Sequence, residues 1–513
     1  MKLLPALLFL ICTAAAVRAR TKPNILIILA DDMGFSDAGC YGGEIETPRL
    51  DKLAADGLRF TQFYNTARCW PSRTAVMCGY YPQQVRADPK QGRLPEWAAT
   101  LPQKLKPLGY RSYHTGKWHV PGAPKPLADA GFDRSLQLED HDRNFNPRNL
   151  IEDDKRLPAV KPGTGFYTTT AFSDHMIGCL KDHAAQHPAQ PFFAYLAFTV
   201  PHFPLHALPE DIAKYRERYK KGWDVLRTER FERMKKLGLA TGELPPLEPD
   251  VTAPSGKESD AALIGPGEMR QARAWDSLTG EQRELQATKM AIHAAMVDRM
   301  DRETGRVLDQ LQAMGAMENT LILFFSDNGA SAELLVRGDG HDRAAAPGSA
   351  GSFLCLGPGG SSLSNTPFRR HKIWVHEGGI ATPLIAHWPR GIADRGALRH
   401  DMGHVIDVMP TILEIAGAPA TAAPALPGRS LVPAFAKDGS VTRDFLFFHH
   451  EQNRALRMGD WKIVSAGPGD WELYDLKTDR AESHNLAAAQ PDRVLRMAAR
   501  WQELQDSYVK QAK

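Results

Sequence analysis

The 513-residue chain has only 6 cysteines, which excludes a small domain held together mainly by disulfides. It also has no large excess of charge of one sign, with 63 basic and 60 acidic residues, and so lacks the overall basic character of a nucleic-acid-binding protein. The sequence contains no internal repeat and no low-complexity tract. Its 43% hydrophobic content is typical of a globular protein, and its length allows more than one domain.

The N-terminus has the pattern of a secretory signal peptide. A Met-Lys start precedes an apolar run at residues 3–17, and small residues follow around Ala19. A membrane anchor or a first core strand is the alternative, but the run is shorter than the ~20 residues that span a membrane. The signal-like N-terminus predicts an exported protein, periplasmic or secreted. Because no second long apolar segment follows, we expect no stable membrane insertion, and the balanced charge predicts no nucleic-acid partner.

Five cysteines remain after the predicted signal peptide. An odd number in an oxidising compartment suggests that one of them has a separate function. The pattern leaves open whether the other four form disulfides. The five are Cys40, Cys69, Cys78, Cys179 and Cys355.

Short apolar runs alternate with helical spacing along the chain. Such runs are typical of strands buried on both faces, as in a parallel sheet. The alternation predicts an α/β fold with a large mixed, mostly parallel sheet sandwiched by helices. The expected strands are 24–30, 110–114, 192–198, 320–325 and, more weakly, 383–388, and the expected helices are 47–58 and 281–314.

The composition changes near the C-terminal end, at residues 416–427. Two earlier segments, 244–266 and 338–364, are expected to be long loops that are functional or mobile. Short strands are expected at 445–450, 453–464 and 471–476, and a closing helix at 490–509. We therefore predict a signal peptide at 1–19, an N-terminal domain at 20–435, and a C-terminal α+β subdomain with a small antiparallel sheet and closing helix at 436–513.

Acidic and amide side chains follow two of the apolar runs. Asp31 and Asp32 come after the first run, and Asp327 and Asn328 come after the run at 320–325. Ligands of open α/β sheets bind beyond the carboxyl ends of the strands, so these side chains are expected to converge. Carboxylates packed together repel unless a cation neutralises them, and oxygen-only ligands suit Ca²⁺ or Mg²⁺ rather than zinc. The alternative is that each pair caps the turn that follows it.

The sequence Cys-Trp-Pro-Ser-Arg at 69–73 has the features of a helix start. Pro71 favours the first turn, and Gly79 would end the helix. Cys69 would then lie at a helix N-terminus, which favours anions, with Arg73 over the same face. Alternatively, Cys69 is a small buried hydrophobic residue, or a thiolate nucleophile whose pKa the helix lowers.

Further basic groups lie at or beyond other expected strand ends. Lys117 and His119 follow the strand at 110–114, His202 follows the strand at 192–198, and Lys372 precedes a Glu-Gly-Gly sequence. Each alone has a structural explanation, but together they would place cations around a metal, as binding of a tetrahedral anion requires. Candidate rim residues, which would contact a sugar or only pack, are Trp374, His376, His449, His450, Glu451 and Arg454, whereas His293, Asp298 and Asp301 are interpreted as structural.

Taken in order, these motifs resemble the formylglycine-dependent sulfatases of the arylsulfatase type, in the alkaline-phosphatase superfamily. The resemblance covers nearly the whole chain after the predicted signal peptide. Two positions depart from the family pattern: Met-Cys-Gly-Tyr at 77–80 replaces Leu-Thr-Gly-Arg, and Val-Pro at 120–121 replaces Leu-Gly. The matching segments are PNILIILADDMG, CWPSR, GKWH, VPHFP, LILFFSDNG, KIWVHEGG, RMGDWK and WELYDLKTDRAESHNL.

The resemblance implies a sulfatase catalytic domain at 20–435 with an alkaline-phosphatase-like fold. Cys69 would be oxidised by a formylglycine-generating or equivalent maturation enzyme to 3-oxoalanine (formylglycine), whose hydrate attacks sulfur. Arg73 and Lys117 would stabilise this hydrate, and His119 would act as base. The implied ligands of Ca²⁺, which is favoured over Mg²⁺, are Asp31, Asp32, the modified Cys69, Asp327 and Asn328; the catalytic residues are Cys69, Arg73, Lys117, His119, His202 and Lys372; and the substrate-binding residues are Lys117, His202, Lys372, His450 and Glu451.

The expected function is hydrolysis of sulfate monoesters by an exported sulfatase. Sulfated carbohydrate is the expected substrate, with aryl sulfates as surrogates. A phosphomonoester, phosphodiester or phosphonate hydrolase of the same superfamily is the first alternative, against which Cys69 and Lys372 argue. A non-catalytic binder of sulfated glycans is the second, and the complete set of expected catalytic residues argues against it.

Overall fold

The computed structural model describes residues 22–89, 91–419 and 424–513. The predicted signal peptide at 1–19 lies outside the described residues. Within those ranges, no helix combines the length and the apolar composition that a membrane span requires.

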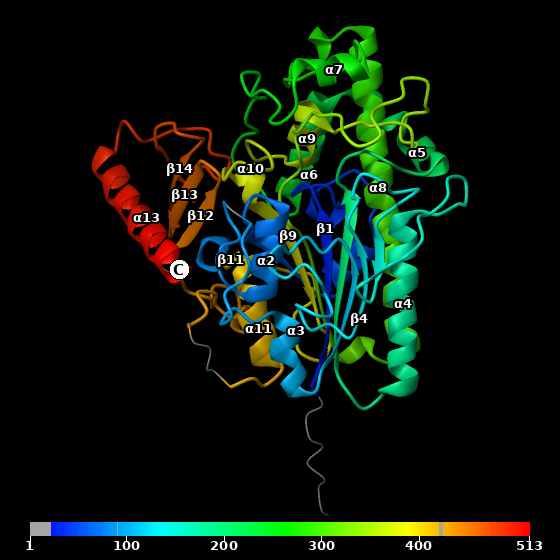
Figure 1. The fold of residues 1–513 in the computed structure, drawn as a ribbon. Helices are drawn as coiled ribbons and strands as arrows, with labels where there is room; N and C mark the ends of the chain where they lie inside the picture. Colours follow the sequence, from blue (N-terminus) through cyan, green and yellow to red (C-terminus); the bar gives the residue numbers. More distant parts are fainter. Residues whose placement is uncertain (1–21, 90, 420–423) are drawn as a thin grey trace, which may run out of the picture.

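A large mixed sheet runs through the centre of the molecule (Figure 1). Its central strand β1 (Asn24–Asp31) lies between β7 (Phe192–Pro201) and β8 (Thr320–Ser326), parallel to both. This core confirms the expected mostly parallel sheet, while β9 (Ala381–His387) runs antiparallel to β8. The remaining strands of this sheet are β2 (Leu58–Tyr64), β3 (Arg111–Gly116), β4 (Arg134–Leu138), β5 (Leu150–Glu152), β6 (Lys155–Arg156), β10 (Ala397–Arg399) and β11 (Gly403–His404), and the order is β10-β2-β9-β8-β1-β7-β3-β4-β5-β6 with β11 beside β2.

Helices cover both faces of this sheet, so β1 is apolar at nearly every position. Successive side chains of a strand point to opposite faces. Leu26 and Ile28 accordingly join one buried cluster, and Ile27 and Leu29 join the other. The first cluster includes α1 (Pro48–Ala55), α4 (Thr168–Gln186) and α8 (Gly280–Ala313), and the second includes α2 (Cys69–Cys78), α3 (Leu101–Leu105) and α11 (Val408–Ile415).

Shorter helices lie mainly in the connections between the strands. The segment expected to be a loop at 338–364 ends in α9 (Gly357–Ser364), and α10 (Glu377–Ile380) leads directly into β9. The segment at 244–266 contains α7 (Glu258–Ile264). The other short helices are α5 (Pro209–Tyr215), α6 (Trp223–Lys236) and α12 (Val432–Ala436).

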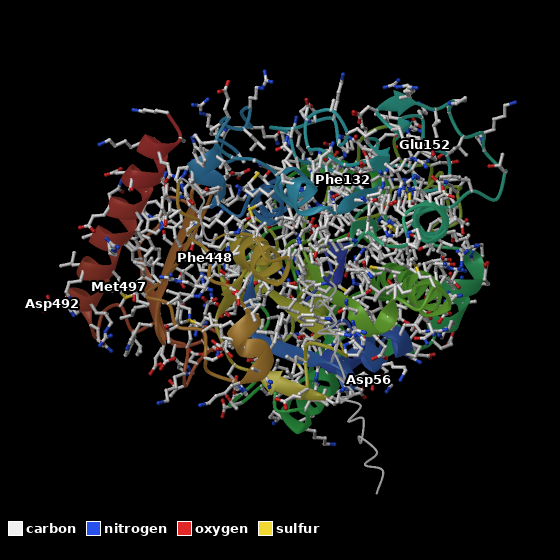
Figure 2. All side chains as sticks on the ribbon, turned by 90° about the horizontal axis from the view of Figure 1, so that it is seen from below. Asp56, Phe132, Glu152, Phe448, Asp492 and Met497 are labelled. Carbon is white, nitrogen blue, oxygen red and sulfur yellow. The ribbon has the colours of Figure 1, made fainter. Side chains whose placement is uncertain are left out.

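The C-terminal part forms a second, four-stranded antiparallel sheet. Phe447 faces α13 (Pro491–Gln511), whose Trp501 ring stacks on it at 5.5 Å, while Phe448 on the other face contacts Tyr64 of β2 at 5.7 Å. Phe448 is buried, and Figure 2 shows where it lies in a view from below. The strands are β12 (Leu446–His450), β13 (Asn453–Met458), β14 (Trp461–Ser465) and β15 (Glu472–Asp475).

Two expected elements differ from the structure. The helix expected at 47–58 ends at Ala55, because the chain turns at Gly57 and Leu58 already belongs to β2. A Cβ at Gly57 would lie 2.5 Å from the Ala386 carbonyl oxygen, so the turn needs glycine. The single strand expected at 453–464 is a hairpin that turns at Gly459, whose φ is +59°.

The five cysteines of the described residues are all free. Cys40 is partly buried, and the other four are buried. Within the described residues, the fold therefore rests on its hydrophobic clusters and its buried ion pairs rather than on disulfides.

Candidate active site

The acidic and amide side chains that follow β1 and β8 meet at one edge of the large sheet. Ala30 and Ser326 are paired in register, so the residues after them emerge side by side. The Asp32 amide nitrogen lies 3.3 Å from Asp327 Oδ1, and Asn328 Nδ2 donates to Asp32 Oδ1 at 2.6 Å. This is the convergence that the strand-end positions predicted.

These side chains form an acidic cluster suited to a hard cation. Asp31, Cys69 and Asp327 each offer a ligand atom within 4.8 Å of the others. Among the described residues, Asp31 Oδ1 and Asn328 Oδ1 are buried oxygens without a hydrogen-bond partner. We call the buried site lined by Asp31, Asp32, Cys69, Asp327 and Asn328 the cup. Desolvation raises the pKa of both Asp31 and Asp32, because this buried site disfavours uncompensated negative charge. Oxygen donors of this kind fit Ca²⁺ or Mg²⁺.

Cys69 is the first residue of α2 and faces this cluster. Arg68 precedes the helix in extended conformation, and Gly79 ends it with a φ of +73°. Cys69 is buried, and desolvation raises the pKa of its thiol despite the nearby Lys117 and Lys372. The interpretation of Cys69 as a thiolate with a lowered pKa is therefore not favoured.

Arg73, one turn further along α2, joins three of the converging segments. Its Nε donates to Asp327 Oδ2 at 2.7 Å, and its Nη1 donates to the Lys117 carbonyl oxygen at 2.6 Å. Its Nη2 lies 3.8 Å from Asp31 Oδ2. The guanidinium is fully buried, so these contacts fix both the helix and the Lys117 backbone.

Lys117 reaches the cluster because a glycine precedes it. Gly116 ends β3 with a φ of +113°, and a Cβ there would lie 1.8 Å from the Ala197 carbonyl oxygen of β7. The close approach of the two strands directs Lys117 inward, where its Nζ donates to Asp31 Oδ2 at 2.6 Å.

His202 and Lys372 approach from the other side of Asp32. His202 follows β7, and its Nε2 lies 3.8 Å from Asp32 Oδ2. Lys372 Nζ lies 2.9 Å from the Asp32 carboxylate and 3.1 Å from Glu333 Oε2. Desolvation, followed by the charges of Lys372 and Lys117, lowers the pKa of His202 well below its usual value.

His119 lies beside Cys69's neighbour Trp70. The two rings are 5.9 Å apart, and the His141 ring lies 5.4 Å from His119 on another side. Desolvation, then the charges of Lys117 and Arg73, lowers the pKa of His119 well below its usual value. Its Nδ1 is buried and has no hydrogen-bond partner among the described residues. Burial and the nearby positive charges therefore favour the neutral form of the His119 imidazole.

The candidate rim residues are more scattered. His450 is buried, with Nδ1 3.0 Å from Asp88 Oδ1 and its ring 5.4 Å from Trp70. Glu451 is exposed, and its charge acts together with the larger effects of Glu333 and Cys69 to raise the pKa of Arg68 against desolvation. The others pack elsewhere: Trp374 lies beside His371, His376 near Glu472, His449 against Gln505 and Trp501, and Arg454 over Trp471.

The residues interpreted as structural have partners away from the cup. Asp301 accepts hydrogen bonds from the backbone nitrogens of Arg49 and Leu50, at the start of α1. Asp298 accepts from Lys214, and His293 lies 2.9 Å from Asp37.

Two residues beside the cup were not identified from the sequence. Glu333 contacts Lys372, and His141 contacts His119. Both lie in irregular segments with no helical or strand periodicity, and neither follows a strand directly. No sequence pattern therefore distinguishes them from loop residues.

Known proteins share the sequence and the fold of this chain. The sulfatase family model matches residues 23–418, and a model of the C-terminal region of N-sulphoglucosamine sulphohydrolase matches residues 369–507. An uncharacterized sulfatase of Schizosaccharomyces pombe is 31% identical over 94% of this chain and 93% of its own. An arylsulfatase of Klebsiella aerogenes is 31% identical over 80% of this chain and 90% of its own.

Two solved structures share the fold. A protein in complex with k-i-k-neocarrahexaose superposes with a TM-score of 0.69 at 22% identity, over 96% of this chain and 94% of that one. A protein in complex with its substrate D-glucosamine-2-N,6-O-disulfate gives a TM-score of 0.65 at 20% identity, over 95% and 98% of the chains. With its alkaline-phosphatase-like sheet and its C-terminal antiparallel sheet, the chain belongs to the sulfatase family and is a sulfuric ester hydrolase.

Proposed function

We propose that this enzyme is an exported sulfatase that hydrolyses sulfate monoesters of sulfated carbohydrates, using Ca²⁺ and a formylglycine derived from Cys69. The main support is that side chains from six distant segments surround one buried cup with the nucleophile position at its wall. Burying charges costs free energy that their pairing offsets only in part, so this cluster is better explained by a role in binding or catalysis than by stability alone.

Five residues would hold the two groups that the family implies. Asp31, Asp32, Asp327 and Asn328 would bind the cation, together with the modified Cys69. The cation would supply positive charge to neutralise the sulfate oxygens. Formylglycine would supply, as its hydrate, a nucleophilic hydroxyl and a second hydroxyl for release of sulfate. The oxygen donors and the two unpartnered buried oxygens are consistent with such a cation.

The basic side chains would bind the ester and move protons. Sulfuryl transfer resembles phosphoryl transfer, in which charge is spread over equatorial oxygens and catalysis is mainly positioning and electrostatics. Lys117 and Lys372 would donate to the sulfate oxygens, and His202 or Lys372 would protonate the departing alcohol. Arg73 would hold the nucleophile through the N-terminal turn of α2.

His119 is suited to the role of base. A base must be unprotonated before it accepts a proton, and burial together with the charges of Lys117, Arg73, Lys372 and Arg68 favours the neutral imidazole. The unpartnered Nδ1 of His119, and the 5.9 Å between its ring and that of Trp70, the residue after Cys69, support this role. It would take the proton whose loss restores the aldehyde.

Sulfated carbohydrate is the substrate class that the comparisons favour. One protein of the same fold was solved with k-i-k-neocarrahexaose and another with its substrate D-glucosamine-2-N,6-O-disulfate. Glu451 is exposed near Arg68 on the side of the small sheet, where it would contact a sugar beside the sulfate. His450 is fully buried between Asp88 and Trp70, so it would support this side of the site by packing. Export is proposed from the signal-like N-terminus.

Mass spectrometry of the peptide containing Cys69 tests the central proposal. The enzyme is produced with a formylglycine-generating enzyme and assayed with an aryl sulfate and with the matching phosphate ester. We expect the aldehyde at residue 69, sulfate release, and much lower kcat/KM for the phosphate. C78A, at a buried cysteine of the same helix, is the control and should retain the aldehyde and activity. Full sulfatase activity with an unmodified thiol would contradict the mechanism, and a preference for phosphate would contradict the substrate.

A further inference from the structure

Glu333 is a buried carboxylate beside the cup that neither the proposed metal site nor the proposed chemistry uses. Its side chain is 2% exposed and lies in an irregular segment six residues after Asp327. Its Oε2 lies 3.1 Å from Lys372 Nζ, and its Oε1 lies 3.2 Å from Arg68 Nη2. Each carboxylate oxygen therefore serves one cation.

Two serines support the same carboxylate. Ser255 Oγ donates to Oε1 at 3.0 Å, and Ser331 Oγ donates to Oε2 at 3.1 Å. The charges of Lys372 and Arg68 outweigh desolvation and lower the pKa of Glu333 to about 2, so it is ionised at neutral pH. A carboxylate with partners on both oxygens and little exposure is held in one orientation.

The two cations that Glu333 joins are both at the reacting end of the cup. Lys372 also contacts Asp32, so its ammonium group is held from two sides and keeps a donor for an ester oxygen. Arg68 directly precedes Cys69, and its guanidinium lies 5.2 Å from the centre of the Trp70 ring. A lysine side chain is flexible, so a single partner would not fix its direction.

We propose that Glu333 is a positioning residue that holds Lys372 and Arg68 in place for binding of the sulfate ester. The inference rests on the proposed role of Lys372 in sulfate binding. Partners that orient binding groups typically change activity 10–100-fold when they are removed. We expect loss of Glu333 to raise KM and lower kcat, without loss of the fold.

The test compares E333Q with E44Q. Glu44 is likewise a mostly buried carboxylate that pairs with two arginines, Arg230 at 2.6 Å and Arg233 at 3.3 Å, but it does not contact the cup. Thermal unfolding should show a loss of stability in both variants. Only E333Q should show a fall in kcat/KM of about 10–100-fold and, by calorimetry, an about tenfold weaker binding of inorganic sulfate.

A double-mutant cycle separates positioning from a general structural effect. If Glu333 acts through Lys372, adding E333Q to K372M should cost far less than E333Q costs in the wild type. Should E333Q fail to fold, S255A and S331A remove one hydrogen bond each from the carboxylate and should give smaller losses of the same kind.

The outcomes are distinguishable. If the wild type is active, two results overturn the inference alone. In the first, E333Q and E44Q have the same kcat/KM. In the second, E333Q lowers kcat/KM by the same factor in K372M as in the wild type. A wild-type chain carrying formylglycine that neither binds sulfate nor releases it from esters overturns the proposed function, and this inference with it.

Discussion

Arg73 shows most clearly how one residue can combine structural and chemical demands. It is a fully buried cation whose main partner is Asp327, a proposed metal ligand. A charge in this environment is stable only while its partner remains ionised, because the guanidinium cannot lose its proton.

Replacing Asp327 with asparagine should therefore affect both stability and activity. Removal of one partner of a buried ion pair typically costs about 3–5 kcal/mol of the free energy of unfolding. D309N is the matched control, because Asp309 pairs with Arg49 at 3.2 Å on the surface and should change stability by less than about 0.5 kcal/mol. Denaturant unfolding measures the first effect and kcat/KM the second. A D327N enzyme as stable and active as D309N would contradict this account of Arg73.

At this scale the sequence predicted the cup better than its surroundings. Asp31 and Asp327 could be placed because Asp31 ends the apolar strand β1 and Asp327 directly follows β8, and strand ends of a parallel sheet share an edge. Glu333 could not be placed, because in an irregular segment the position of a residue in the sequence does not predict which way its side chain points. His450 was expected on the rim but is fully buried beside Asp88, since the register of the small sheet, which decides this, was not predicted.

At the scale of elements, β3 and β7 approach each other so closely that a side chain at the end of β3 would not fit. Gly116 is the residue at that point, and Lys117 follows it. The conformation and the contact distance both require glycine.

G116A should therefore be damaging in a way that G109A is not. Gly109 also has a positive φ, +89°, but a Cβ added there would meet no atom within 4 Å. G109A should cost only about 1–2 kcal/mol for the left-handed conformation. G116A adds a backbone clash that displaces Lys117, so it should lose most sulfatase activity as well as stability. Comparing Tm and kcat/KM of the two variants tests this, and equal activity losses would be inconsistent with it.

Apolar strands and long helices were predictable because their periods are strong, whereas turns between elements were not. The run in β1 and the amphipathic pattern of α8 appear within a few residues of their expected positions. The end of α1 was misplaced because Leu58 continues the helical spacing although it belongs to β2. Its strand pairing with β9, more than 300 residues away, is tertiary information that local spacing does not contain.

At the scale of the molecule, a buried ion network joins the small sheet to the segment that carries Lys372. Lys462 of β14 lies 2.9 Å from Glu377 of α10 and 2.7 Å from Glu482, and all three are buried. Glu377 follows Lys372 by five residues, so the C-terminal part supports the cup through this network.

K462M should weaken this connection. It leaves two buried carboxylates without their shared cation, which should cost about 3–5 kcal/mol of the free energy of unfolding. Since Glu377 is near Lys372, kcat/KM should fall too. K477M, at an exposed lysine of the same part of the chain, is the control and should leave both unchanged. Unfolding monitored by calorimetry and steady-state kinetics measure the two effects; full activity in a destabilised K462M would argue against support of the cup.

The order of the strands also determines how late during synthesis the environment of Cys69 is completed. Asp327 accepts a hydrogen bond from Arg73, which lies on the same helix as Cys69. Asp327 comes 258 residues after Cys69 in the sequence. At translation rates of 5–20 residues per second, the ribosome needs about 10–50 s to cover that distance. Until then the contact between Asp327 and Arg73 cannot form, which would leave the proposed maturation enzyme time to act on Cys69 before that residue is buried.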